Sequence, residues 1–530
     1  MICWDVWKRA RNGKRCLLFP LASLMAAGIS LSAAAATPAA IGNDDIEPPR
    51  QGEGVVVRVW PEADVGPVKP MNGSNSGPNA IPHGANRDPL AYHPNHRFDD
   101  FRDLEVPMIR THDSRFSVGA PNRVNDIALI FPDFDADEND PKNYDFLATD
   151  DYLDAARSVG CEIMYFLGSS CDTEMGGRPC GTDEPPKDFA KWARIVEHVV
   201  RHYNEGWGWS NPDVPFSNQF NIVNWEIWNE PDLDCDDSYW TTGEKTFFRR
   251  RRYWHGSPEQ FFDLYRTTAL HLKRTFPGIK VGGPGLAGRK LWAEHFVDFC
   301  EKNGVPLDFF TYHGYMSGKA SNFSAFARQY REMLDRHGFK EAQTFMNEWN
   351  WHRGWGNDQW SESVRLRSDP NNFLIAAFYA ATFSVLQHEP VDGLMYYDMR
   401  ANCYYNGVFA SNSSAPLKGY YAFYAWKKLR RLGREVKSDI LGADKDGVYA
   451  VAAKGKAGSL ALLVTRSVSG ADALGTIPVR LSVAGRSLAN ARLHVTDELE
   501  RYTERTLRVA TDGTATIRLR PHAFAVVELP

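Results

Sequence analysis

The sequence predicts an α/β fold, a (β/α)8 TIM barrel followed by a C-terminal β-sandwich domain. Three observations support this prediction. Helical and strand-like apolar patterns alternate between about residue 55 and about residue 430, as they do in parallel barrels. Two short apolar runs end on glutamates, Glu230 and Glu348, at the position where barrel strands carry functional side chains. After Arg434 the helical pattern stops, and short apolar strands alternate with turns rich in Gly, Ser, Asn and Asp.

The alternation can be followed in order along the chain. The first strand is expected at Val55–Val59, a run of β-branched residues. Each later helix has apolar residues three or four positions apart, and a short β-rich run follows it. The expected helices span 149–159, 189–203, 258–276, 291–303, 323–337 and 373–387. The expected strands span 162–167, 220–228, 279–282, 309–312, 344–346 and 393–397.

The chain divides into four expected segments. Residues 1–36 are expected to be a secretory signal peptide, because a basic stretch precedes an apolar stretch and an Ala-rich cleavage site. The apolar stretch is short for a membrane-spanning helix, so the mature protein is expected to be exported, periplasmic or secreted, without a membrane segment. Residues 37–53 are expected to be a disordered leader. Residues 54–434 are expected to form the catalytic barrel, and residues 435–530 a β-sandwich accessory domain.

The composition narrows the range of functions. The net charge of −5 over 530 residues argues against a general nucleic-acid binder. The 16 tryptophans are enough both to fill a core and to supply flat faces on which sugars stack. No C-x-x-C or H-E-x-x-H pattern indicates a metal site, so neither a metal nor a cofactor is expected. Cys171 and Cys180 flank a Gly- and Pro-containing loop, and in an exported protein they form either a disulfide or two free thiols.

The two glutamates are the most informative residues. Glu230 lies in Asn229-Glu230-Pro231 at the end of an apolar run, and Pro231 ends the strand because it cannot donate to a β-ladder. Glu348 lies in a second run that ends beside Asn and Trp, about three βα units further along the chain. Both carboxylates would therefore face one pocket. Glycoside hydrolysis requires two such carboxyl groups, one to protonate the leaving oxygen and one to attack the anomeric carbon or activate water.

Seven motifs then occur in a fixed order: Val68–Gly73, Ile109–Asp113, Trp225–Pro231, Lys280–Pro284, Phe309–Tyr315, Asn347–Asn350 and Tyr396–Arg400. In this order they resemble the glycoside hydrolases of clan A, and within that clan family 39, which contains β-xylosidases and α-L-iduronidases. The resemblance covers roughly residues 55 to 430. Ser74–Ser76 and the aromatic loop after Glu348 depart from the family pattern, so the resemblance alone does not give the substrate.

The resemblance implies roles for individual residues. Glu230 is expected to be the acid/base and Glu348 the nucleophile of a retaining mechanism, in which configuration at the sugar is kept. Asn229 is expected to form a hydrogen bond with the sugar 2-hydroxyl or with the neighbouring nucleophile. Other strand ends are expected to supply substrate contacts, and at least one tryptophan after Glu348 is expected to form a platform for the sugar. The expected contacts are Arg110, His112, Asp113, His313, Tyr315, Trp349 and Trp351, with Trp355 and Trp360 as further platform residues.

These inferences favour an exported, retaining, exo-acting glycoside hydrolase similar to a β-xylosidase, acting on oligosaccharides or polysaccharides. Alternatives within the class are an arabinosidase, a uronosidase, a galactosidase or an endo-acting exopolysaccharide hydrolase. Arg249–Arg252 is interpreted as a solvated charge run, with guidance of an anionic substrate as the alternative. An alternative of another class is a catalytically silent carbohydrate-binding barrel, against which the presence of both carboxylates argues.

Overall fold

A computed structural model describes most of the chain beyond residue 53. The described residues are 54–80, 96–112, 124–168, 184–212, 214–217, 220–235, 237–242, 253–401, 403–442, 447–469 and 475–530. The expected signal peptide and leader, Asp113, Cys171, Cys180 and Arg249–Arg252 lie outside these residues and stay predictions. No helix among the described residues is long and apolar enough to cross a membrane.

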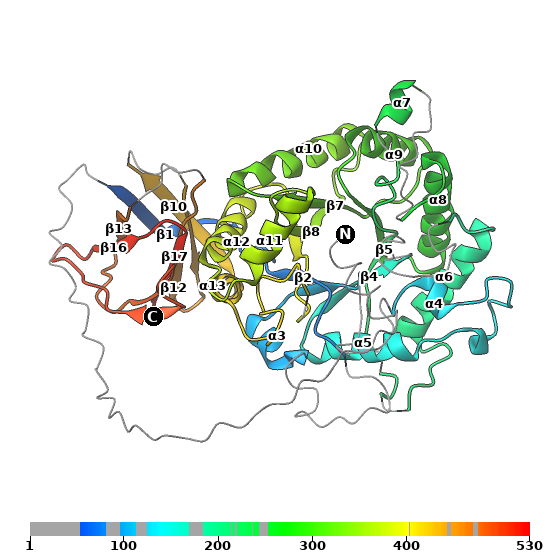
Figure 1. The fold of residues 1–530 in the computed structure, drawn as a ribbon, viewed down its shortest axis with the longest axis horizontal. Helices are drawn as coiled ribbons and strands as arrows, with labels where there is room; N and C mark the ends of the chain where they lie inside the picture. The colour runs from blue at the N-terminus through cyan, green and yellow to red at the C-terminus, as the bar shows by residue number, and fades with distance from the viewer. Residues whose placement is uncertain are drawn as a thin grey trace, which may run out of the picture. The chain divides into compact units, whose positions relative to one another are not determined.

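Eight parallel strands close into a barrel, with neighbours in the order of the chain, as predicted (Figure 1). Met164, Phe309, Phe345 and Met395 form a hydrophobic cluster from four of the strands, so side chains fill the barrel. The strands are β2 (Gly73–Asn75), β3 (Met108–Arg110), β4 (Glu162–Leu167), β5 (Asn224–Ile227), β6 (Lys280–Leu286), β7 (Phe309–Met316), β8 (Gln343–Trp351) and β9 (Gly393–Tyr396).

Helices surround the barrel (Figure 1). The six helices expected from apolar spacing are present, with ends within two residues of the expected positions. Local signals fix these ends; α8, for example, begins with Ser257 and Gln260 in a capping box and Pro258 in the first turn. The six are α5 (Leu147–Ser158), α6 (Phe189–Glu205), α8 (Pro258–Thr275), α9 (Lys290–Lys302), α10 (Phe323–Arg336) and α12 (Phe373–Leu386). Further helices are α3 (Phe98–Leu104), α4 (Ile127–Ile130), α7 (Ser238–Thr242), α11 (Asn357–Ser368) and α13 (Lys418–Leu432).

The C-terminal β-domain is one nine-stranded sheet in the order β15-β14-β17-β12-β11-β10-β1-β13-β16. The sheet curls over, because β16 at its edge contacts β17 near the other edge, and one hydrophobic cluster joins both ends. The strands are β1 (Val55–Pro67), β10 (Arg434–Leu441), β11 (Val448–Lys454), β12 (Leu460–Arg466), β13 (Ile477–Val483), β14 (Arg492–Thr496), β15 (Thr503–Arg505), β16 (Ala515–Leu519) and β17 (Ala523–Leu529).

The expected first strand, Val55–Val59, is a strand but does not belong to the barrel. It is the start of β1, which pairs with β10 and β13 of the sheet. Val55, Val57 and Val59 are buried and the residues between them are not, and such alternation suits a strand with only one buried face. The range 54–434 expected for the barrel therefore contains one strand of the sheet, and the barrel begins at β2.

The sheet also packs against the barrel helices. Leu463, Phe524 and Val526 belong to the same hydrophobic core as α12 and α13, which contact β12 and β17. The ammonium group of Lys418 at the start of α13 donates to the backbone carbonyls of Asp497 and Glu498. In the chain, α12 lies between the barrel strands β8 and β9, and α13 follows β9. The sheet therefore supports the side of the barrel that these two helices cover.

Candidate active site

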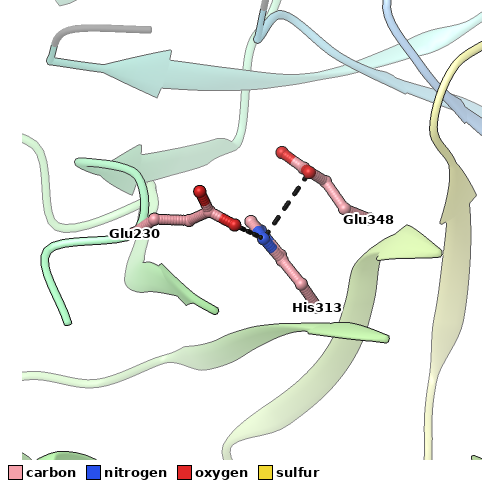
Figure 2. A group of neighbouring side chains, drawn as sticks. All are labelled: Glu230, His313 and Glu348. Carbon is pink, nitrogen blue, oxygen red and sulfur yellow. Dashed lines mark hydrogen bonds and ion pairs between the residues drawn. The ribbon is translucent and has the colours of Figure 1, made fainter. Parts of the chain in front are cut away.

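Four barrel strands bring the two predicted catalytic residues and two of the predicted substrate contacts together at their carboxyl ends. Arg110 is the last residue of β3, Glu230 follows β5 by three residues, His313 lies in β7 and Glu348 in β8. Figure 2 shows the side chains of Glu230, His313 and Glu348 converging on one point. One ligand atom from each of these three side chains lies within 4.8 Å of the other two. The two carboxyl groups predicted from the sequence thus face each other.

The carboxylate of Glu348 is held by several donors. Arg110 Nη1 donates to its Oε1 over 2.8 Å, and the Tyr315 hydroxyl donates to its Oε2 over 2.6 Å. His112 Nε2 and His313 Nδ1 each lie 3.5 Å from a Glu348 oxygen. Burial raises the pKa of Glu348, whereas His313 and Arg110 act in the opposite direction. These donors favour the charged form that a nucleophile needs.

The guanidinium of Arg110 is fully buried and connects the site to the barrel wall. Its Nε donates to Glu226 over 2.5 Å, and its Nη2 donates to Asn229 Oδ1 over 2.8 Å. Glu226 also accepts from the Thr311 hydroxyl and the Asn347 amide, each over 2.6 Å. A planar guanidinium bonded in three directions has one orientation, so Arg110 fixes both Glu348 and Asn229.

Glu230 is held by a histidine and by an unusual backbone. His313 Nδ1 lies 2.8 Å from Glu230 Oε1. Burial lowers the pKa of His313 to about 4, so the ring is neutral near pH 7 and acts on Glu230 as a hydrogen-bonding dipole. The backbone at Trp228 and Glu230 is left-handed, with φ of 73° and 45°. Such conformations are rare outside glycine and concentrate at functional sites, where the surrounding structure enforces them.

Two buried polar atoms beside the carboxyls are available for a ligand. Asn229 Nδ2 and His313 Nε2 have no hydrogen-bond partner among the described residues, although both side chains are buried. A buried polar atom without a hydrogen-bond partner costs about 1–3 kcal/mol. The hydroxyl groups of a bound sugar would satisfy these atoms, as the prediction for Asn229 requires.

The structure does not support the predicted sugar contacts by two tryptophans. Trp349 is fully buried, and its ring packs against Phe323 at the start of α10 and Phe383 of α12, outside the barrel wall. The irregular register that follows Met346 places Glu348 with the inward-facing residues and directs Trp349 outward. Trp351 also belongs to the hydrophobic core. Both side chains therefore contribute to the hydrophobic core.

An exposed tryptophan instead lies next to a residue that binds Glu348. Trp355 is 62% exposed, and its ring centroid lies 5.4 Å from that of Tyr315, whose hydroxyl binds Glu348. Tyr397 and Tyr405 continue this aromatic wall, with centroids 5.0 Å apart. Asn350 positions both tyrosines by donating to their backbone carbonyls over 2.6 and 2.7 Å. Trp355 therefore matches the sugar platform expected among the tryptophans after Glu348.

The three converging ligand atoms of Glu230, His313 and Glu348 also meet the geometric minimum for holding a metal ion. However, Arg110 already places a positive charge 2.8 Å from Glu348, which opposes a second cation at the same carboxylate. The donor set fits a pair of catalytic carboxyls better than a metal centre.

A closed (β/α)8 barrel with two facing carboxyls at the carboxyl ends of its strands is the arrangement of glycoside hydrolases. The chain belongs to glycosyl hydrolases family 39, because the model of that family matches residues 124–400.

Two curated relatives cover part of the chain. A β-xylosidase of Caldicellulosiruptor saccharolyticus is 32% identical over 188 residues, which are 34% of this chain and 33% of the relative. A β-xylosidase of Geobacillus stearothermophilus is 31% identical over 156 residues, 29% of this chain and 26% of the relative. The chain therefore matches about a third or less of each curated relative's length.

Solved structures share the fold over a longer range. A glucosidase from Croceicoccus marinus has a TM-score of 0.68 at 20% identity, covering 89% of this chain and 98% of that chain. A monomeric β-xylosidase from Caulobacter crescentus has a TM-score of 0.59 at 15% identity, covering 89% and 99%. At these identities the similarity establishes the common architecture.

Proposed function

We propose that the protein is a retaining glycoside hydrolase in which Glu348 is the nucleophile and Glu230 the acid/base. The separation of the two carboxyls carries this proposal, because their nearest ligand atoms lie within 4.8 Å. Double displacement requires carboxyl groups about 5–5.5 Å apart, whereas inverting enzymes keep them about 6.5–9.5 Å apart to admit a water molecule.

In the first step Glu230 donates its proton to the glycosidic oxygen while Glu348 attacks the anomeric carbon. The bond to the leaving group breaks, and a covalent ester forms with Glu348. Because Arg110 and Tyr315 bind the two different oxygens of Glu348, the carboxylate is oriented before the substrate arrives. In the second step Glu348 carries no charge, so Glu230 loses its proton more easily. It then acts as the base that activates water.

The neutral state of His313 supports the acid role of Glu230. A protonated imidazole 2.8 Å from Glu230 would stabilise the carboxylate and remove the proton that the first step needs. Burial holds the pKa of His313 at about 4, so the ring orients Glu230 without adding positive charge near pH 7.

The substrate that we propose is a β-xyloside, on the basis of the two curated β-xylosidases that share this region of the chain. A panel of aryl β-xyloside, α-L-arabinofuranoside, β-glucoside, β-galactoside and α-L-iduronide tests this choice. We expect kcat/KM to be highest for the xyloside. A higher value for another sugar would reassign the substrate, and a folded protein that cleaves none of them would contradict the proposed function. Export, predicted from residues 1–36, stays a prediction.

Trp355→Ala is expected to raise KM for an aryl xyloside about 3–10-fold with kcat changed less than about twofold, because stacking contributes about 0.5–1.5 kcal/mol to binding. Steady-state kinetics checks this result. Trp60→Ala provides the control, since Trp60 lies in β1 of the nine-stranded sheet and is expected to leave KM unchanged. An unchanged KM for Trp355→Ala would exclude the ring as a sugar platform.

A further inference from the structure

Besides Glu226, another buried carboxyl group lies close to the site but outside the proposed chemistry. Asp232 is fully buried in the loop that follows β5, two residues after Glu230. Its Oδ1 accepts from the backbone N–H of Ala287 over 2.9 Å. Its Oδ2 accepts from the N–H groups of Gly288 and Arg289 over 3.0 and 2.9 Å. Asp232 thus joins the loop after β5 to the loop after β6.

These bonds surround the segment that holds Glu230. The Glu230 N–H donates to the carbonyl of Gly285 over 2.9 Å, and Gly285 N–H donates to the Thr311 hydroxyl over 2.7 Å. A side chain added at Gly285 would collide with the Arg110 guanidinium, which shows how closely the end of β6 approaches the site. The left-handed Glu230 backbone is therefore enforced from both sides, by Gly285 directly and by Asp232 two residues later.

The second effect of Asp232 is electrostatic. Burial raises the pKa of Asp232 to about 6, the three backbone donors act against this shift, and the neighbouring Glu230 adds to it. The interaction is reciprocal, since a negative charge on Asp232 raises the proton affinity of Glu230 equally.

We propose that Asp232 is a positioning residue for the acid/base. It holds the backbone at Glu230 through the loop of residues 287–289, and its negative charge helps to keep the Glu230 carboxyl protonated until the substrate is bound. This inference rests on the proposed function and extends it. It assigns the position and the protonation of Glu230 to a residue that does not touch the substrate.

Among the described residues, the following titratable groups around Glu230 and Asp232 do not replace this effect. His313 from β7 is neutral above about pH 4, and Arg110 from β3 is already bonded to both Glu226 and Glu348. Tyr330 from α10 has a pKa raised by burial and by Asp232, so it stays uncharged. Glu348 from β8 adds a negative charge in the free enzyme and loses it in the covalent intermediate. Asp234 and Asp237 lie in the same loop as Asp232 and bind other backbone N–H groups.

Asp237 offers a matched control. Its Oδ1 accepts from the backbone N–H of Leu291 and Trp292 in the first turn of α9, next to the segment that Asp232 binds. Asp232 and Asp237 therefore make the same kind of structural contact with neighbouring residues, but only Asp232 lies two residues from the acid/base. If Asp232 only held the residues before α9 in place, replacing Asp232 or Asp237 by Asn would have similar effects on the pH dependence of the reaction.

The experiment compares the pH dependence of kcat/KM for phenyl β-xyloside, whose leaving group needs protonation, in wild type, Asp232→Asn and Asp237→Asn. The alkaline limb reports the pKa of the acid in the free enzyme. Removing the charge of Asp232 should move this limb to lower pH by about 0.5–1 unit, as expected when a neighbouring like charge is lost. Asp237→Asn should leave the limb in place, whatever its effect on the melting temperature.

Further variants keep the test decisive. Asp232→Ser also removes the charge and keeps one acceptor, so it should give the same shift if Asp232→Asn does not fold. Asp232→Glu retains the charge and should keep the limb near its wild-type position while lowering kcat. An unmoved limb in a folded, uncharged variant, or an equal shift in Asp237→Asn, would overturn the inference. A wild-type protein that cleaves no glycoside would instead contradict the proposed function itself.

Discussion

Glu348→Gln is expected to lower kcat on aryl xylosides by about 10⁴-fold or more, because an amide cannot attack the anomeric carbon and form the ester. The amide has the shape of the carboxyl and can still accept hydrogen bonds from Arg110 or Tyr315, so the fold should persist. Steady-state kinetics and a thermal melt on the same preparation check both expectations. A folded variant with near wild-type kcat would remove Glu348 from the mechanism.

The second large effect is expected for Glu230→Ala. Cleavage of a poor leaving group such as phenol should fall about 10²–10⁴-fold, the usual contribution of general acid catalysis. An activated leaving group such as 2,4-dinitrophenol departs without a proton, so the first step should be little affected and the ester should accumulate. Equal losses for both leaving groups would show that Glu230 is not the acid.

Azide distinguishes the two glutamates in the same assay. In Glu230→Ala, azide needs no base and should release the ester as a glycosyl azide with the configuration of the substrate. In Glu348→Ala, azide should occupy the place of the missing carboxylate and give the inverted glycosyl azide. Proton NMR of the two products gives the answer, and exchanged configurations would reverse the roles assigned to Glu230 and Glu348.

The helices and the later barrel strands could be predicted because their patterns are long. In α6, α8 and α10 the apolar residues recur on one face over several turns, and the ends carry recognisable signals. The start of the barrel could not be predicted in this way. The three residues of β2, Gly73–Asn75, have no apolar pattern, whereas the valines of β1 have a strong one although β1 joins the sheet. Which sheet a strand joins depends on partners far along the chain.

The proposed catalytic pair could be predicted because each glutamate lies at or near the end of a strand within a recognisable motif. The structure also brings the predicted Arg110, His112, Asn229, His313 and Tyr315 to this site. It does not support the predicted sugar contacts of Trp349 and Trp351, because both side chains lie in the hydrophobic core. The irregular register of β8 directs Trp349 outward, and no sequence signal marks this irregularity. Glu226 was missed, although a charged residue inside the apolar run before Asn229 was a usable signal.

Asp232 and Trp355 became apparent only from the three-dimensional structure. The contacts of Asp232 come from a segment about 55 residues away, and short sequence motifs do not report such pairings. For Trp355, the sequence indicated that a tryptophan after Glu348 would serve as a platform. The exposure of the ring and its position beside Tyr315 distinguished it from the buried Trp349 and Trp351.

The most direct test of the proposed mechanism is proton NMR of the first sugar released by the wild-type enzyme, recorded before the anomers interconvert. Two successive displacements at one carbon restore the starting configuration, so hydrolysis of a β-xyloside should release β-xylose first, with α-xylose appearing later by mutarotation. Initial release of α-xylose would mean a single displacement by water, and it would contradict the assignment of Glu348 as a nucleophile.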